Sequence, residues 1–156
     1  MMLTIIKTIG DIFDTQADAI CNPVNARAIP GAGVAAFCAK KWPIFENSWR
    51  EYAEKHKNSI KTGDVFPIQL YKNDNWQYLF NVVTMLEPGS KVNAIDIAES
   101  IMGIIKTANQ FDINSIAMPY LGCGVGRFAE SDFERLLKCA SNHRPLTILL
   151  VKYRGW

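Results

Sequence analysis

Residues 115–128 read SIAMPYLGCGVGRF, and this stretch decides the fold. Its first part, 115–118, is short and apolar, as is typical of a buried strand. Gly122, Gly124 and Gly126 follow within a few residues, and an amphipathic segment comes after them. A strand, a glycine-rich loop and a helix in this order indicate that something comes very close to the backbone.

Strands and helices alternate along the rest of the chain. Apolar runs predict strands at 3–7, 18–22, 62–68, 76–84, 115–118 and 146–151. Apolar residues at helical spacing predict helices at 34–42, 43–57, 93–109 and 131–140. Pro43 separates the first two helices, and Ser131 with Glu134 forms a capping-box pattern. With one hairpin at the polar turn 72–75, the pattern predicts a three-layer α/β/α domain, 1–156, around a central mixed sheet.

The composition is that of a globular chain with a nearly balanced charge. Apolar residues make up 49% and charged residues 21%, so the chain can bury a core. The net charge of +2 is too small to indicate nucleic-acid binding by itself. No apolar run is long enough to span a bilayer, and residues 1–7 indicate a strand rather than a signal peptide. We expect a cytoplasmic monomer with no membrane partner.

The cysteines and histidines show no metal-ligand pattern. None of the four cysteines forms a Cys-x-x-Cys pair, and three are expected to be buried in a reducing compartment: Cys21, Cys38 and Cys139. His56 and His143 lie near predicted helix ends, and neither has the spacing of a nucleophile's partner. The sequence therefore indicates no metal and no cofactor.

Two loops are candidates for binding an anion. The first, 22–35, has two prolines and includes Gly31 and Gly33, which leave the N-terminus of the next helix bare. The second is the glycine loop, 120–128, whose successive amides can form an anion-binding nest. Ligands of α/β sheets bind at the carboxyl ends of the strands, so the pair indicates one ligand with two phosphates. Neither loop has the P-loop sequence or the dinucleotide-binding spacing.

The ordered set of motifs resembles a known family. The likeness rests on four segments that together cover nearly the whole chain: Gly10-Asp11-Ile12, 18–25, 31–35 and 115–124. These are similar to macrodomains, and in particular to the compact branch with a Gly-Cys-Gly loop. That branch includes ADP-ribose 1''-phosphate phosphatases, terminal ADP-ribose glycohydrolases and DNA ADP-ribosyl glycohydrolase antitoxins. The resemblance implies that the partner is ADP-ribose or an ADP-ribosylated macromolecule, and nucleic acid only where it carries ADP-ribose.

The resemblance also implies a role for each loop. Asp11 would accept a hydrogen bond from the adenine amino group, and the Ile12 amide would meet a ring nitrogen. Asn25 would bind the distal ribose, and Phe128 would shield a ribose. The first loop would line the distal ribose and the diphosphate through Gly31, Gly33, Val34 and Ala35. The second would wrap the diphosphate through Gly122, Cys123, Gly124, Val125 and Gly126. Arg127 and Arg27 are further phosphate donors, although a solvated loop arginine explains each equally well.

The sequence departs from the glycohydrolases of this branch at three positions. Met85 stands where they have a lysine after a strand-end threonine, and Gly126 stands where one type has an aspartate. Pro30 replaces a histidine or aspartate that often acts on protein-linked ADP-ribose. Lysine-dependent chemistry is therefore not expected, and Asn25 is the residue that could position a water. Cys123 lies among amides that would lower a thiol pKa, but without a base it is the less favoured nucleophile.

Two functions are left open. The first is an enzyme, an ADP-ribose 1''-phosphate phosphatase or ADP-ribosyl hydrolase, that acts through water positioned at the distal ribose. The second is a non-catalytic module that recognises ADP-ribose. A third hypothesis, a single-stranded nucleic-acid binder that uses exposed aromatic residues, is weaker because the charge is nearly balanced. Tyr153 could stack on adenine, but an ordinary tyrosine near the last strand is the simpler interpretation.

Overall fold

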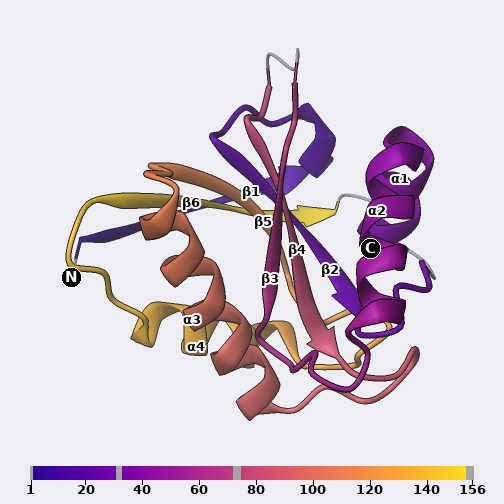
Figure 1. Cartoon of the computed structure of the whole chain (residues 1–156). Helices are drawn as coiled ribbons and strands as arrows, with labels where there is room; N and C mark the ends of the chain where they lie inside the picture. The colour runs from indigo at the N-terminus through magenta and orange to yellow at the C-terminus, as the bar shows by residue number, and fades with distance from the viewer. Residues whose placement is uncertain (1, 31–32, 72–74, 154–156) are drawn as a thin grey trace.

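The computed structural model describes residues 2–30, 33–71 and 75–153. Within them six strands form one mixed sheet in the order β1-β6-β5-β2-β4-β3 (Figure 1). The strands are β1 (Leu3–Gly10), β2 (Ala19–Asn25), β3 (Val65–Gln69), β4 (Tyr78–Met85), β5 (Ser115–Pro119) and β6 (Leu146–Tyr153). Neighbouring strands are parallel except for β3, which runs antiparallel to β4. The predicted mixed sheet, with one hairpin formed by two strands that follow each other in the chain, is confirmed.

Helices cover both faces of this sheet. The helices α1 (Gly33–Lys41) and α2 (Pro43–Lys55) lie on one side in Figure 1, and α3 (Ala94–Gln110) and α4 (Glu130–Cys139) lie on the other. A short 3-10 turn, η1 (Ile12–Asp14), follows β1. The predicted three-layer α/β/α architecture is therefore confirmed.

The two faces of the central strands bury separate cores. Cys21 and Phe80 join the larger cluster, which packs against α3 and α4. Their chain neighbours Ile20 and Leu79 join a second cluster with Cys38 of α1. Successive strand residues point to opposite faces, so a strand with helices on both sides is apolar along its length. This explains why the sequence of β2 and β4 shows continuous runs rather than alternation.

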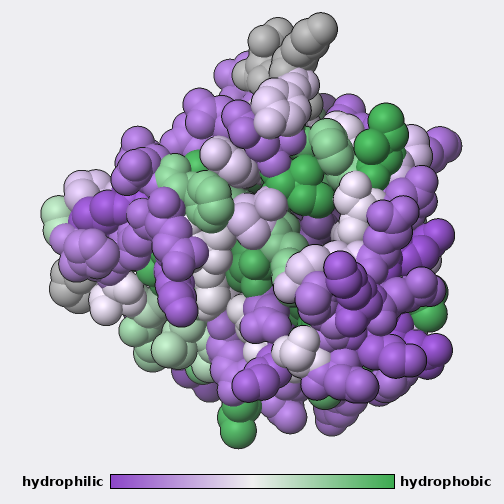
Figure 2. All heavy atoms as spheres, viewed as in Figure 1, coloured by the Kyte–Doolittle hydropathy of each residue, from purple (hydrophilic) through white to green (hydrophobic). Residues whose placement is uncertain are grey.

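The surface around the β3–β4 hairpin differs from the rest of the visible face. Figure 2 shows hydrophilic residues over most of that face and hydrophobic residues gathered near its centre and upper part. The hairpin lies at one edge of the sheet, and Tyr71, two residues after β3, is largely exposed.

None of the helices in the described ranges is long and apolar enough to cross a membrane.

Two predicted helix starts are confirmed and one is wrong. Asn93 caps α3 through a reciprocal capping box with Asp96, and Pro43 opens α2. The predicted box at Ser131 and Glu134 is not used, because α4 already begins at Glu130 with Ala129 as its N-cap and no side-chain cap. The sequence pattern was present, but the helix starts one residue before it.

The cysteine predictions are also partly corrected. Cys21 and Cys38 are buried, as expected, and burial raises the pKa of both thiols. Cys139 is exposed, which contradicts the prediction. It follows the buried Leu137 by two residues, about 200° around the helix, so it points away from the core. A helix stripe that contains Phe133 and Leu137 cannot also contain residue 139.

Candidate functional site

A cleft of about 380 Å³ opens at the carboxyl ends of β2 and β5. It is bordered by the β2–α1 loop with the first turn of α1, the β4–α3 loop and the glycine loop 120–128. The two predicted loops meet here because β2 and β5 are parallel neighbours, whose carboxyl ends share one edge of the sheet. Eight predicted site residues line this cleft: Asn25, Gly33, Val34, Ala35, Gly122, Gly124, Val125 and Gly126.

A smaller hollow of about 70 Å³ adjoins the cleft. The two predicted adenine contacts, Asp11 and Ile12, line it, and Tyr153 lies there as well. Gly33 and Val34 line both spaces, so the hollow and the cleft are neighbours along one surface. Asp11 uses one carboxylate oxygen to accept from the Phe13 N–H at 2.9 Å, which fixes its side chain at the start of η1.

Three predicted residues fall elsewhere, and the position of a fourth is not described. Gly31 lies outside the described residues. Cys123, Arg127 and Phe128 line neither of the two hollows. Phe128 packs against the larger core cluster, and Arg127 is exposed with a left-handed φ of 58°.

Two segments that line the cleft carry backbone donors. Within the described residues, the N–H groups of Gly124, Val125 and Gly126 have no hydrogen-bond acceptor, whereas those of Cys123 and Arg127 are paired within the loop. The first N–H groups of α1, which begins at Gly33, also lack intrahelical partners, as at any helix start. Residues that line the same cleft therefore carry two sets of free amides, and free amides are suited to phosphate oxygens.

Two glycines of the loop are required by packing within the protein. A Cβ on Gly126 would lie 2.5 Å from Cγ2 of Val92 and 2.6 Å from the carbonyl oxygen of Gly122. Gly122 has φ +74°, and its Cβ would lie 2.9 Å from side-chain atoms of Val92 and Ile97. The loop is also joined to the segment before α3 by the Val92 N–H, which donates to the Gly126 carbonyl. These contacts explain both glycines before any ligand is considered.

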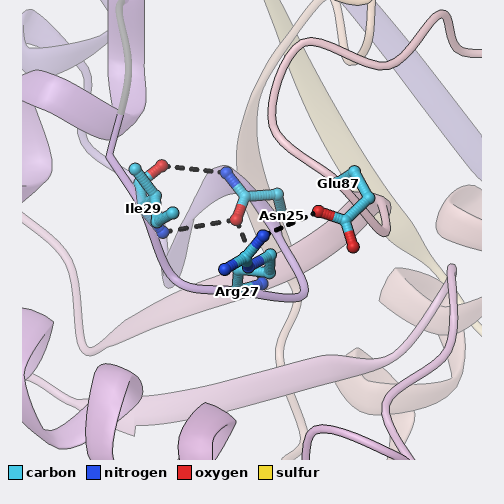
Figure 3. Close-up of polar contacts among 4 residues, drawn as sticks. All are labelled: Asn25, Arg27, Ile29 and Glu87. Atoms are coloured by element: carbon cyan, nitrogen blue, oxygen red, sulfur yellow. Dashed lines mark hydrogen bonds and ion pairs between the residues drawn. The ribbon is translucent and has the colours of Figure 1, made fainter.

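Asn25 holds the first loop together (Figure 3). Its Oδ1 accepts from the backbone N–H groups of Arg27 at 3.1 Å and Ile29 at 3.2 Å. Its Nδ2 donates to the Ile29 carbonyl at 2.8 Å. An amide nitrogen has two hydrogens, so one N–H of Asn25 is left for a ligand or a water in the cleft that the side chain lines.

Arg27 does not line the cleft, and its side chain pairs with a carboxylate instead. Its Nη1 lies 3.2 Å from a carboxylate oxygen of Glu87, on the β4–α3 loop, as Figure 3 shows. Both side chains are more than half exposed, so the pair contributes little stability. It nevertheless links two of the three segments that border the cleft.

The environment of Cys123 is the reverse of the predicted one. Burial, together with the nearby carboxylate of Glu130, raises the pKa of the Cys123 thiol to about 12. The side chain packs against the apolar core, and its Sγ donates to the Leu121 carbonyl at 3.6 Å. The prediction of a lowered thiol pKa is therefore wrong. At neutral pH this residue is a protonated thiol, which is a poor nucleophile.

Sequence reasoning missed the floor and one wall of the cleft. Asn22 and Asn81, on adjacent strands, lie at the floor, and the wall contains Trp42, the N-cap of α2, with Phe45 and Trp49 of α2. An asparagine within each of two apolar strand runs was the signal for the floor. The aromatic residues contributed only to the apolar spacing that predicts helices 34–42 and 43–57, and this spacing gave no sign that they also border a cavity. In the described ranges no group of acidic, histidine or cysteine side chains could hold a metal ion.

Comparison with known proteins identifies the family of this chain. The sequence profile of the Macro domain family matches residues 21–137, from β2 to α4. This chain belongs to the macro domain family. The matched range contains both loops of the cleft, whereas Asp11 and Tyr153 of the smaller hollow lie outside it.

Relatives of this macro domain agree with the assignment. A DNA ADP-ribosyl glycohydrolase from Mycobacterium tuberculosis is 23% identical over 136 residues, which are 87% of this chain and 38% of that protein. The macrodomain of Mycobacterium tuberculosis DarG matches with a TM-score of 0.86 at 20% identity, over 95% of this chain and 97% of the other. Thermosipho africanus DarTG, solved in complex with ADP-ribose, gives 0.78 at 18% identity, over 93% and 41%. These structural likenesses show a shared fold.

Proposed function

We propose that this macro domain binds ADP-ribose across the cleft and the adjoining hollow. The observation that carries the proposal is that two sets of free backbone amides belong to residues lining one cleft. A diphosphate there would receive hydrogen bonds from the glycine loop and from the start of α1. The adenine would then lie in the hollow beside Asp11, whose second carboxylate oxygen is free to accept. The ADP-ribose complex of the Thermosipho africanus relative supports this choice of ligand.

We further propose that the domain processes ADP-ribose derivatives, either by dephosphorylating ADP-ribose 1''-phosphate or by removing ADP-ribose from a macromolecule. Asn25 supports this proposal because its amide is fixed by three hydrogen bonds and keeps one N–H. That N–H could orient a water at the distal ribose. The name of the Mycobacterium tuberculosis relative supports hydrolysis as the reaction class.

The alternative is a domain that binds ADP-ribose without turning it over, and the lining of the cleft supports it. Met85 lines the cleft with a thioether, at the position where glycohydrolases of the compact Gly-Cys-Gly branch have a lysine. The one carboxylate or cation among the described lining residues is Glu46, which is ion-paired with Arg50 at 2.6 Å. A cleft without a free general acid or base can bind well and catalyse slowly.

The partner of the protein follows from the same proposal. We propose ADP-ribose, free or attached to a macromolecule, as the partner, with nucleic acid bound only where it carries ADP-ribose. The four free cysteines are consistent with a reducing compartment such as the cytoplasm. A monomeric state is likewise proposed.

Calorimetric titration with ADP-ribose, with AMP as the control, tests the binding proposal. ADP-ribose should bind much more tightly than AMP, because AMP lacks the second phosphate and the distal ribose. Equal affinities would overturn the placement of the diphosphate. Gly33→Glu is a suitable inactive variant, since Gly33 has φ +65° and a carboxylate there would repel phosphate.

Release of inorganic phosphate from ADP-ribose 1''-phosphate then separates the enzyme from the binding module. Release above that of Gly33→Glu, lowered in Asn25→Ala, supports the enzyme. Tight binding of ADP-ribose with no release above that variant, and no release of ADP-ribose from modified nucleic acid or protein, supports the binding module.

A further inference from the structure

The two edges of the sheet differ in how well they are protected against pairing with another chain. The edge strand β3 has five residues and contains Pro67, which has no N–H to donate. Short edge strands with a proline are typical of protected edges. The other edge strand, β1, has eight residues, no proline and an unbroken register with β6. In the described part of the sheet β6 is the one strand bonded to β1, so the other side of the β1 backbone is open.

The open strand carries apolar side chains in contact with solvent. Ile6 is 49% exposed and Ile9 is 63% exposed. The charged residue of β1 is Lys7, whose Nζ lies 2.5 Å from a carboxylate oxygen of Glu134 on α4. A lysine on an edge usually repels a second strand, but this lysine is neutralised by the carboxylate within its own chain. A long, regular and apolar edge of this kind is a template for another strand.

The hydrogen bonds to β6 show which backbone groups of β1 are open. The carbonyl of Met2 accepts from the N–H of Leu146, so the backbone groups of Met2 point towards β6. Backbone groups of successive strand residues point in alternate directions, and the register with β6 has no shift. The N–H and C=O groups of residues 4, 6 and 8 therefore point to β6 as well. Those of residues 3, 5, 7 and 9 point to the open side.

The side chains of β1 are arranged almost symmetrically about Ile6. Residues 3–9 read LTIIKTI, so a threonine and then an aliphatic residue follow in either direction from the neighbours of Ile6. If two copies of the strand run antiparallel with their Ile6 residues opposite each other, like side chains face each other across the join. The pairs that result are Thr4 with Thr8 and Leu3 with Ile9. Cross-strand pairs of threonines and of aliphatic residues both stabilise a sheet.

The open backbone groups fit the same register. Residues 3, 5, 7 and 9 of one copy lie opposite residues 9, 7, 5 and 3 of the other, so all of them form hydrogen-bonded pairs. Lys7 lies opposite Ile5, and each lysine keeps its own Glu134. Centring the pair on Lys7 would oppose two lysines, and centring it on Ile5 would place Ile9 beyond the end of the partner strand. A shift by one residue would set open groups against groups already bonded to β6.

We propose that β1 is a self-association edge, on which a second copy of this chain pairs antiparallel with the two Ile6 residues at a two-fold axis. The two sheets then form one continuous sheet across the axis. The proposal does not depend on the proposed ligand, because the cleft lies at the ends of β2 and β5 and β6 separates β1 from both.

The expected dimer is a weak one. A single pair of strands is a small interface, of the class below about 1,200 Å² that is typical of transient complexes. The monomer proposed above is then the form at low concentration, and the dimer forms as the concentration rises.

Sedimentation equilibrium over a range of protein concentrations tests the association. The average mass should rise from that of one chain towards that of two between ~10 µM and ~1 mM. Ile6→Lys sets two like charges against each other at the axis and should hold the mass at one chain, with an unchanged circular dichroism spectrum. Ile95→Lys is the matched control, since Ile95 is an exposed isoleucine on α3 outside the cleft lining, and this variant should associate like the unmodified chain. A constant mass of one chain for the unmodified protein, or a dimer that survives Ile6→Lys, would overturn the proposal.

Disulfide cross-linking tests the register, in a Cys139→Ser background that removes the exposed native thiol. Opposed residues of a non-hydrogen-bonded antiparallel pair have Cα atoms about 4.5 Å apart, within reach of a disulfide. Ile6→Cys should therefore cross-link with itself under mild oxidation. Thr4→Cys and Thr8→Cys should cross-link with each other when mixed and far less when alone. Ile95→Cys gives the rate of random collision, and cross-linking of Ile6→Cys no faster than this, or of Thr4→Cys alone as fast as in the mixture, would overturn the proposed pairing.

Discussion

The two loops that border the cleft are held in place by different forces. In the β2–α1 loop one polar side chain, Asn25, makes three hydrogen bonds to the backbone at Arg27 and Ile29. In the glycine loop the main chain at Gly122 and Gly126 packs directly on Val92. The first loop therefore depends on a group that also faces the cleft, and the second depends on contacts behind the cleft. Substitutions should separate folding from binding in the second loop more easily than in the first.

The largest expected effect is on the packed loop. Gly126→Val would force a side chain into Val92 and the Gly122 carbonyl, where even a Cβ lies 2.5–2.6 Å away. We expect a loss of about 3 kcal/mol in the free energy of unfolding, at the upper end of overpacking costs. Urea denaturation followed by circular dichroism measures it. Gly10→Ala is the matched control, since a Cβ there meets nothing within 4 Å, and it should change stability by less than about 0.5 kcal/mol. Equal stabilities for the two variants would contradict the packing explanation.

The polar loop should respond more moderately in stability but also in binding. Asn25→Ala leaves two backbone N–H groups and one carbonyl without their partner, so we expect a loss of about 2 kcal/mol in the free energy of unfolding and weaker ADP-ribose binding. Asn93→Ala removes a capping asparagine of α3 that does not line the cleft. It should cost about 1 kcal/mol of stability and leave the affinity unchanged. Calorimetric titration of both variants with ADP-ribose measures the affinities. An equal loss of affinity in Asn25→Ala and Asn93→Ala would contradict a role of Asn25 in binding.

The adenine end offers a sharper test of the smaller hollow. Asp11→Ala should weaken ADP-ribose binding by ~1–3 kcal/mol, because the adenine amino group loses its acceptor. Asp11 also accepts from the Phe13 N–H, so stability should fall by about 1 kcal/mol. Titrations with ADP-ribose and AMP measure the affinity. Unchanged affinity for both ligands, with a measurable loss of stability, would show that Asp11 only caps η1.

The smallest effect is expected at the link between two bordering segments. Removing the ion pair by Arg27→Ala or Glu87→Ala should change stability by less than about 1 kcal/mol, because both side chains are more than half exposed. A double-mutant cycle of the two substitutions measures the coupling. If Arg27 contacts a phosphate instead of Glu87 when ligand is bound, Arg27→Ala alone would weaken ADP-ribose binding, and Glu87→Ala would strengthen it.

The sequence was sufficient for the architecture because its strongest signals are local. Continuous apolar runs marked the strands that have helices on both faces, and Asn93 and Pro43 marked two helix starts. The glycine loop was located from its composition and its place after a strand. The packing contacts that require glycine in this loop were not predictable, because Val92 and Ile97 approach the loop only in the folded protein.

The sequence predicted which loops form the site, but it did not predict the surroundings of the individual side chains. The thiol pKa of Cys123 was predicted in the wrong direction, because the residue turns towards the core and Glu130 rather than towards the amides. Asn25 was predicted as a ligand contact, and its bonds within its own loop could not be read from the spacing. Asn22 and Asn81 are far apart in sequence and become a pair only through the register of β2 and β4.

The strand order has a consequence for synthesis of the chain on the ribosome. β1 is the edge strand beside β6, and the two pair in parallel along their full length, from Leu3 with Leu146 to Gly10 with Tyr153. The strand made first therefore pairs with the strand made last. Among the described strands β1 pairs with β6 alone, so it lacks its native partner until residues 146–153 emerge, although β2, β4 and β5 can already assemble. Delivery of the final strand should be the step that completes the sheet, and a nascent chain stalled before it should expose β1 to chaperones and proteases.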